Sequence, residues 1–367
     1  MKKIMTVFGT RPEAIKMSPV IRALREDPRF ETAVCVTGQH RQMLDQVLDA
    51  FHIVPDYDLS IMKENQTLFD VTTGILNSIR DVLEEVRPDL VLVHGDTTTT
   101  FVTALACYYC RIPVGHVEAG LRTHDIYSPF PEEFNRQGVG LIAAIHFAPT
   151  DAARDNLLGE GKNPERIVVT GNTAIDALRT TVSGEYTHPV LDWARGSRLV
   201  LVTAHRRENL GEPMYQMFRA IKRVTDEHED VKVVYPVHLN PAVRKIADEV
   251  LRGDPRIRLI EPMEVLDFHN LMARCYLVLT DSGGIQEEAP SLGKPVLVMR
   301  NTTERPEGVA AGTLKLVGTE EESIYQAAKE LLENPEAYQA MAGARNPYGD
   351  GHAGRRIVEA IGRFLGA

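Results

Sequence analysis

A short strand, a glycine pair and a helix follow one another late in the chain, and this succession constrains the fold most strongly. The apolar run Leu277–Thr280 is typical of a buried parallel strand. Ser282-Gly283-Gly284 then opens a helix, and the run Pro295–Met299 predicts the next strand. Glycines let a ligand approach a turn closely, and the free N–H groups of a helix start attract anions. We expect a phosphate site here, although a tight turn alone would also explain two glycines.

The same alternation of apolar runs and helical segments extends through the whole chain. Strands that alternate with helices of about ten or more residues predict doubly wound, parallel sheets. A length of 367 residues is sufficient for two such domains. The other runs typical of buried strands are Lys3–Phe8, Thr32–Thr37, Asp89–His94, Ile112–Val117, Arg198–Thr203, Val231–Tyr235 and Ile257–Ile260.

The expected domain limits follow from where this rhythm stops. Residues 180–197 carry Ser, Gly, His and Pro without a clear period, which is typical of a linker. We predict an N-terminal Rossmann-like domain of residues 1–172 and a C-terminal one of residues 173–353. Residues 354–367 predict an amphipathic helix, and the loop before it could return the chain to the first domain.

Composition excludes several classes of protein. A net charge of −10 argues against nucleic acid as the main partner. The sequence has no apolar run near the roughly 20 residues of a membrane span. Four cysteines without a disulfide pattern fit a reducing cytosol, so we expect a cytoplasmic protein. Cys107 and Cys110 stand in an apolar helix, which favours buried thiols over a metal or redox site.

Two basic residues stand near the start of the helix that follows the first strand. Thr10 suits the cap of this helix, and Arg11 and Lys16 follow it. Cations are disfavoured near the positive end of a helix dipole, so a bound anion would explain their position. A capped helix with a solvated arginine is the structural alternative.

Polar residues follow four successive strands of the first half, namely Arg11, His40, Asp96 and Glu118. In open parallel sheets, ligands bind outside the carboxyl ends of the strands. Each acidic residue has a structural alternative, because Asp96 could cap a helix and Glu118 could pair with Arg122. Glu132 begins another helix, where acidic residues are common for dipole reasons alone.

The second half carries the complementary groups. His205 and His238 stand at the ends of neighbouring strands, where a histidine can relay a proton. Glu288 stands one turn after the glycine pair, and Arg305 follows the next strand. The sequence has neither G-x-G-x-x-G after the first strand nor a P-loop, which disfavours NAD redox chemistry and P-loop hydrolysis. Several carboxylates without a histidine cluster indicate acid–base chemistry.

Seven motifs stand in one order along the chain: Gly9-Thr-Arg-Pro-Glu13, Gly95-Asp-Thr97, His116-Val-Glu-Ala-Gly-Leu-Arg-Thr123, Pro131-Glu-Glu133, His205-Arg-Arg-Glu-Asn209, Thr280-Asp-Ser-Gly-Gly-Ile-Gln-Glu-Glu-Ala-Pro290 and Thr303-Glu-Arg-Pro-Glu307. Together they closely resemble the non-hydrolysing UDP-N-acetylglucosamine 2-epimerases. The resemblance implies two Rossmann-like domains of the glycosyltransferase-B type with a cleft between them. It also implies a homodimer that interconverts UDP-N-acetylglucosamine and UDP-N-acetylmannosamine, without added cofactor or metal, for cell-surface polysaccharide.

The resemblance assigns roles to individual residues. It implies that Asp96, Glu118 and Glu132 form the acid–base set, with base and acid unassigned, and that His205 assists the leaving phosphate. Inverting C2 needs proton-handling groups on both faces of the sugar, which suits several carboxylates. The implied substrate contacts are Arg11, Lys16, Ser282, Gly283, Gly284, Glu288 and Arg305, with Phe268 near the uracil unless it is ordinary core.

Some bacterial members of the family bind a second UDP-N-acetylglucosamine as an activator. Gln39, Gln42, Glu132, Arg206 and His238 match that pocket. Asn65 stands where those members carry Arg. Met263 stands where other members carry Gln, which alters the uracil pocket. Activation is therefore a hypothesis with one charged contact missing.

Three other functions remain open on sequence alone. A glycosyltransferase of the same fold would need an acceptor, and a hydrolysing epimerase would release free N-acetylmannosamine. A sugar-nucleotide sensor could keep the phosphate-binding glycines but would not need three carboxylates.

Overall fold

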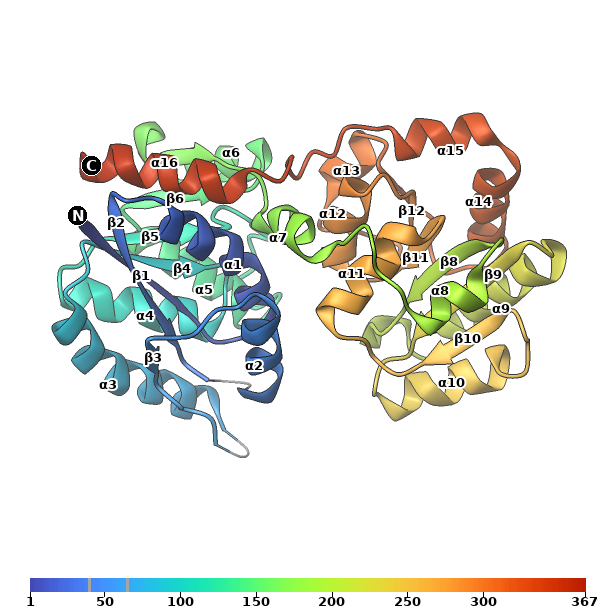
Figure 1. Cartoon of the computed structure of the whole chain (residues 1–367), viewed down its shortest axis with the longest axis horizontal. Coiled ribbons are helices and arrows are strands. Elements are labelled where there is room, and N and C mark those ends of the chain that lie inside the picture. The colour runs from blue at the N-terminus through green and yellow to red at the C-terminus, as the bar shows by residue number, and fades with distance from the viewer. Residues whose placement is uncertain (39–40, 64–65) are drawn as a thin grey trace. The chain divides into compact units, whose positions relative to one another are not determined.

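The computed structural model describes residues 1–38, 41–63 and 66–367, apart from the side chains of residues 41–43. The chain forms two compact units (Figure 1). Unit 1 comprises Met1–Thr180 and Tyr348–Ala367, and unit 2 comprises Thr181–Pro347.

The sheet of unit 1 is wholly parallel within the described residues. Its seven strands follow the order β3-β2-β1-β4-β5-β6-β7. The register places Phe8 beside Val36 and His94 beside Val117, so the strands end at one common edge. The strands are β1 (Lys2–Phe8), β2 (Phe30–Val36), β3 (Tyr57–Asp58), β4 (Leu90–His94), β5 (Val114–Val117), β6 (Ile145–Ala148) and β7 (Ile167–Val169).

Helices connect these strands and bury apolar faces against the sheet. Val71, Ile75 and Ile79 of α3 lie at intervals of four residues and pack in one core with Val91 and Val93 of β4. The helices of unit 1 are α1 (Arg11–Glu26), α2 (Arg41–Ala50), α3 (Leu68–Val86), α4 (Thr98–Tyr109), α5 (Glu132–Ile142), α6 (Asp151–Gly159), α7 (Thr173–Thr181), whose last residue belongs to unit 2, and α16 (Ala353–Leu365), with the short η1 (Pro164–Arg166).

Unit 2 repeats the plan with a second parallel sheet, of order β10-β9-β8-β11-β12-β13 within the described residues. Its strands are β8 (Arg198–Thr203), β9 (Val231–Pro236), β10 (Ile257–Ile260), β11 (Leu277–Thr280), β12 (Val296–Val298) and β13 (Leu314–Leu316). Its helices are α8 (Pro189–Ala194), η2 (Arg207–Asn209), α9 (Glu212–Glu227), α10 (Pro241–Leu251), α11 (Val265–Arg274), α12 (Gly283–Ser291), α13 (Pro306–Ala310), α14 (Glu321–Glu333) and α15 (Pro335–Ala342). The predicted pair of parallel α/β sheets is confirmed.

The limits of the units differ from the predicted limits at both connections. Unit 1 extends to Thr180 and resumes at Tyr348 because the two connecting segments pair with each other. The N–H of Asn172 donates to the carbonyl of Tyr348 at 2.7 Å. Gly171 and Gly349 both have positive φ, and a side chain on either would lie within 3.3 Å of the other's Cα. Only glycine suits such a close crossing.

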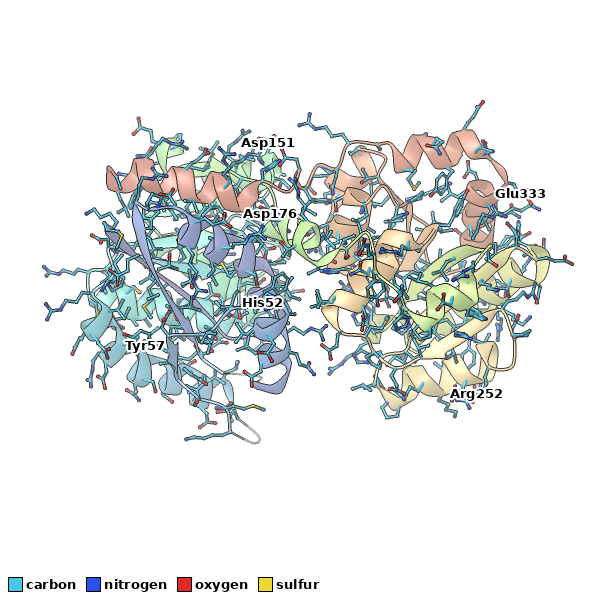
Figure 2. The ribbon with its side chains drawn as sticks, viewed as in Figure 1. His52, Tyr57, Asp151, Asp176, Arg252 and Glu333 are labelled. Carbon is cyan, nitrogen blue, oxygen red and sulfur yellow. The ribbon has the colours of Figure 1, made fainter. Side chains whose placement is uncertain are left out.

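The final helix is fastened to unit 1 by one carboxylate. Asp176 of α7 accepts hydrogen bonds from the backbone N–H groups of Ala353 at 3.1 Å and Gly354 at 2.8 Å. These are the first two residues of α16, whose N–H groups have no partner within the helix. Figure 2 labels Asp176 beside this helix and Asp151 at the exposed start of α6. Asp176 therefore caps α16 from another helix.

We expect D176A to lower the free energy of unfolding by about 1–2 kcal/mol, the usual effect of losing a helix cap. D151A is the matched control, because Asp151 forms only an exposed ion pair with Arg154 and should change stability by less than about 1 kcal/mol. Chemical denaturation followed by circular dichroism measures both. Equal effects in the two variants would contradict the capping role.

Candidate active site

The first strand of unit 1 leads directly into a capped helix. Thr10 and Glu13 form a capping box at the start of α1, and Arg11 is the first helical residue. Lys16 follows within the next two turns and extends toward the end of β5. The predicted cap at Thr10 is present, and the turn delivers two cations to the carboxyl edge of the sheet.

Glu118 is the centre of the polar cluster at this edge. It follows β5 and has a φ of 61°, in the left-handed region that side-chain-bearing residues rarely adopt. One carboxylate oxygen, Oε1, accepts hydrogen bonds from Lys16 Nζ and, at 3.3 Å, from Asn172 Nδ2. The other, Oε2, lies 3.8 Å from His94 Nε2. The side chain is only 12% exposed, so the Lys16 ion pair is poorly screened by water.

The expected alternative for Glu118, a salt bridge with Arg122, is not present. Arg122 instead pairs with Glu160 through two bonds of 2.5 and 3.0 Å. Beside the cluster, burial lowers the pKa of His94 to about 4. The imidazole is therefore neutral at neutral pH and can act there only as a neutral hydrogen-bonding group.

Asp96 belongs to a second network at the same edge. The helix after it, α4, is capped by Thr97, so the alternative that Asp96 is only a helix cap is wrong. Its carboxylate accepts a bond from Arg136, which also donates to Glu133 at 2.9 Å. Arg136 thus joins Asp96 to the first turn of α5, which begins at the half-buried Glu132.

A buried carboxylate that the sequence analysis did not assign organises the corresponding edge of unit 2. Asp281 follows β11 and is fully buried. Its Oδ2 accepts bonds from the backbone N–H groups of His205 and Arg206, each at 2.9 Å, and from Asn209 Nδ2 at 3.2 Å. Burial opposes the charged form, but these bonds and the nearby His205 ring lower the pKa of Asp281 overall.

The two histidines predicted at strand ends of unit 2 lie together. His205 Nδ1 is 3.2 Å from Asp281 Oδ1, which orients the imidazole. The rings of His205 and His238 stack with centroids 5.5 Å apart. Burial, and secondarily the His205 ring, lowers the pKa of His238. Arg206 donates from Nε to the carbonyl of Asp281 at 2.9 Å, so it is part of the same assembly.

The glycine pair opens α12 as expected, with Ser282 just before the helix. A side chain at Gly283 would meet the guanidinium group of Arg305 at about 3.1 Å. Arg305 is held there by a bond of 2.8 Å from its Nε to Glu287. Arg300, by contrast, is buried and bonded to Glu304 at 2.7 and 3.1 Å, so Arg305 is the cation beside the helix start.

Glu288 and Phe268 lie beyond the glycines. Glu288 Oε2 is 3.7 Å from His269 Nε2, and His269 Nδ1 is 2.7 Å from the hydroxyl of Thr181. Phe268 is partly buried on α11 beside His269, with ring centroids 6.5 Å apart. Carboxylate, aromatic ring and helix start thus belong to one neighbourhood of unit 2.

Some predicted residues fall outside what the structure describes. Gln39, His40 and Asn65 lie in the gaps, and the side chain of Gln42 is not described. Met263 is partly buried just before α11. Across the described residues, histidine, cysteine and acidic side chains form no group of three or more suited to a metal ion. No helix built from those residues is both long and apolar enough to cross a membrane.

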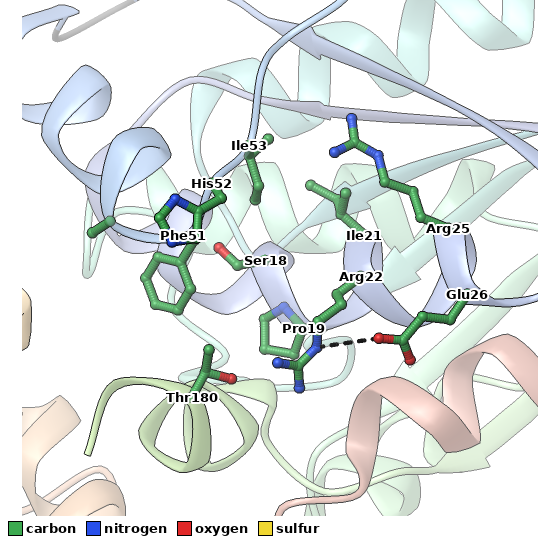
Figure 3. Close-up of a pocket in the computed structure, with 11 residues that line it drawn as sticks. Ser18, Pro19, Ile21, Arg22, Arg25, Glu26, Phe51, His52, Ile53 and Thr180 are labelled. Atoms are coloured by element: carbon green, nitrogen blue, oxygen red, sulfur yellow. Dashed lines mark ion pairs between the residues drawn. The ribbon is translucent and has the colours of Figure 1, made fainter. Parts of the chain in front are cut away.

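One cavity in unit 1 does not involve the candidate residues. It has a volume of about 400 Å³ and is lined by the second half of α1, the turn Phe51–Ile53 and Thr180 (Figure 3). Arg22 and Glu26 form an ion pair of 3.9 Å in its wall. Because α1 begins at the strand ends and runs away from them, this cavity is separate from the Glu118 cluster.

The family model of UDP-N-acetylglucosamine 2-epimerase matches residues 22–362. The chain belongs to this family. It is an enzyme of the isomerase class, and a UDP-N-acetylglucosamine 2-epimerase of Bacillus subtilis is 63% identical to it over 98% of this chain and 94% of the relative.

Solved structures of the family have the same fold. The Listeria monocytogenes structure is 56% identical, covers 100% of this chain and 98% of its own, and has a TM-score of 0.96. The epimerase of Neisseria meningitidis, bound to UDP-GlcNAc, is 50% identical with a TM-score of 0.88 and covers 98% and 100% of the two chains. The two parallel sheets are of the glycosyltransferase-B type, as predicted.

We expect D281N to lower the free energy of unfolding by about 1–3 kcal/mol at neutral pH, because an uncharged amide weakens three charge-assisted bonds. The folded pKa of Asp281 lies below its usual value, so its contribution is complete above about pH 4 and is lost as pH falls through the folded pKa. Chemical denaturation at a series of pH values measures the free energy of unfolding of D281N and of the parent. The difference between the two should become smaller at acidic pH. D248N, which alters only the partly exposed pair with Arg252, should show a smaller loss, and a pH-independent D281N effect would contradict this account.

Proposed function

We propose that this chain interconverts UDP-N-acetylglucosamine and UDP-N-acetylmannosamine by anti elimination and re-addition of UDP. The proton at C2 is removed while the C1–O bond to UDP breaks, and a C1=C2 double bond forms in 2-acetamidoglucal. UDP then adds back to C1 while a proton arrives at the opposite face of C2. Each turnover therefore returns every atom except the exchanged proton.

The observation that carries the proposal is the Glu118 cluster. A carboxylate held by Lys16 and Asn172 on a strained backbone is the arrangement expected of a group that must present an oxygen in one direction. Asp96, fixed by Arg136, and Glu132, at the start of α5, supply further acid–base groups at the same sheet edge. More than one carboxylate suits a reaction that handles protons on two faces of the sugar.

We assign UDP to unit 2 on chemical grounds. The start of α12 offers backbone N–H groups at Gly283 and Gly284, with Arg305 beside them, which suits a diphosphate. The N–H of Ser282 already donates to the hydroxyl of Thr280 at 2.9 Å, so Ser282 would contribute its own hydroxyl. Glu288 is the candidate partner of a ribose hydroxyl, and Phe268 of the uracil. His205, oriented by Asp281, is the candidate partner of the departing phosphate. Arg11 and Lys16 on α1 are the candidate substrate contacts of unit 1.

Proton NMR in D2O with UDP-N-acetylglucosamine, without acceptor or added cofactor, tests the reaction. We expect deuterium at C2 of both epimers. E118Q should slow the exchange by about 10²–10⁴-fold, the usual effect of losing an acid–base group. E31Q, which removes an exposed carboxylate on β2, is the control and should retain the parent rate.

The outcomes separate the alternatives. An unchanged spectrum without acceptor would contradict epimerisation and favour a glycosyltransferase. Free N-acetylmannosamine would identify a hydrolysing epimerase. If the parent exchanges deuterium at C2 and E118Q does so at the same rate, epimerisation is supported and the acid–base role of Glu118 is rejected.

We also propose that a second UDP-N-acetylglucosamine activates the enzyme. We further propose that the enzyme is a cytoplasmic homodimer that supplies the synthesis of cell-surface polysaccharide. Of the candidate activator residues, the structure describes the side chains of Glu132, Arg206 and His238. Arg206 and His238 adjoin the Asp281 assembly. With UDP-N-acetylmannosamine alone, the initial rate should depend sigmoidally on the substrate concentration. A trace of UDP-N-acetylglucosamine should make this dependence hyperbolic. A hyperbolic curve unchanged by that trace would reject activation.

A further inference from the structure

Glu13 is a buried carboxyl group that the proposed reaction does not use. It stands on α1 and is only 3% exposed. Its Oε2 accepts bonds from the backbone N–H groups of Gly9 at 3.0 Å and Thr10 at 2.8 Å, which completes the capping box. Capping explains this oxygen fully, but it does not explain the contacts of the second oxygen, Oε1.

The second oxygen reaches a different helix. Oε1 lies 2.7 Å from the hydroxyl of Thr97 and 3.1 Å from that of Thr100, both at the start of α4. Thr97 is the cap of α4 and directly follows Asp96. The hydroxyl of Thr100 continues the network by donating to the carbonyl of His94 at 2.5 Å. One side chain therefore joins two strand-to-helix turns that carry candidate active-site residues.

The hydrogens in this network can be counted. A carbonyl only accepts, so the hydroxyl hydrogen of Thr100 points to His94. The single hydroxyl hydrogen of Thr97 cannot fill both its contact with Glu13 and its contact of 3.1 Å with Thr100. A hydrogen on Glu13 Oε1 fills the contact with Thr97 and frees the Thr97 hydrogen for Thr100, so that only the 3.1 Å contact between Thr100 and Glu13 has no hydrogen. Burial, the largest influence, raises the pKa of Glu13, which supports a carboxylic acid at this place.

We propose that Glu13 is a positioning residue that, as a neutral carboxylic acid, braces the turn carrying Arg11 and Lys16 against the turn carrying Asp96. This inference rests on the proposed function of Asp96 and Glu118. Glu13 touches no reacting atom in this scheme. It sets the spacing between the cation that holds Glu118, on α1, and the carboxylate that precedes α4.

The local geometry shows how a loss of the brace would reach the chemistry. Lys16 lies one turn after Glu13 on the same face of α1 and is bonded to Glu118. Thr97 adjoins Asp96, and the Thr100 bond fixes the backbone of His94, whose ring lies 3.8 Å from Glu118. A shift of either turn would therefore move two of the groups around Glu118 relative to Asp96.

The decisive comparison is E13A against E13Q. Glutamine keeps an acceptor for the two backbone N–H groups and places an N–H donor toward Thr97 and Thr100, as the neutral acid does. We expect E13A to lower kcat by about 10- to 100-fold, since small displacements of catalytic groups have effects of this size. E13Q should recover roughly tenfold or more of that loss, and KM should change less than kcat in both variants.

Two further variants separate bracing from simple loss of a cap. Thr67 and Asp70 form the same capping box at the exposed start of α3, so D70A removes an equivalent group without the link to a second helix. D70A should leave kcat unchanged. T97V removes the bond from the α4 side while Glu13 remains, and it should lower kcat by roughly tenfold even if E13A fails to fold.

The outcomes are distinguishable from failure of the proposed function. If the parent chain exchanges no deuterium at C2, the reaction itself is wrong. If the parent exchanges deuterium and E13A retains the parent kcat, only the positioning role is rejected. If E13A does not fold, T97V with the parent kcat leads to the same conclusion. An E13Q variant as impaired as a folded E13A would overturn the neutral-acid brace, because a charged carboxylate would then be required.

Discussion

The parallel alignment of every described strand pair is the constraint on which the rest depends. In such a sheet all strands end at one edge, and every helix that follows begins there. The register makes this concrete in unit 2, where Thr203 and Thr280 are neighbours, so the residues just beyond them meet. Asp281 consequently lies against the backbone of His205. Residues distant in sequence become one site without any special loop.

The elements and the site positions could be predicted because they depend on local patterns. Buried parallel strands are short apolar runs, and the polar residue that follows each run must emerge at the sheet edge. The places of Glu118, Asp96 and His205 after the ends of strands were predicted in this way, and the place of Gly283 at a helix start was predicted from its glycine pair. None of these inferences needs knowledge of which strands are neighbours.

Side-chain partners could not be predicted in the same way, because they depend on contacts between distant segments. Arg122 stands four residues from Glu118, and proximity in sequence favoured their pairing. In the structure Lys16 from α1 takes that place, and Arg122 turns to Glu160. Asp281 was missed for a related reason, since its three donors come from the segment that follows the neighbouring strand β8. A carboxylate that directly follows a buried strand and stands two residues before a glycine pair was the available signal.

The backbone of Glu118 brings local strain and chemistry together. A side-chain-bearing residue with φ near 61° costs of the order of 1–3 kcal/mol, and glycine at this position would remove that cost. Glycine would also remove the carboxylate that Lys16 and Asn172 hold. Opposite it, Gly95 leaves space, since a side chain there would come within 3.3 Å of Glu118 Oε2. Backbone strain at Glu118 and the absence of a side chain at Gly95 therefore have the same result. Together they direct one carboxylate oxygen of Glu118 toward the end of β4.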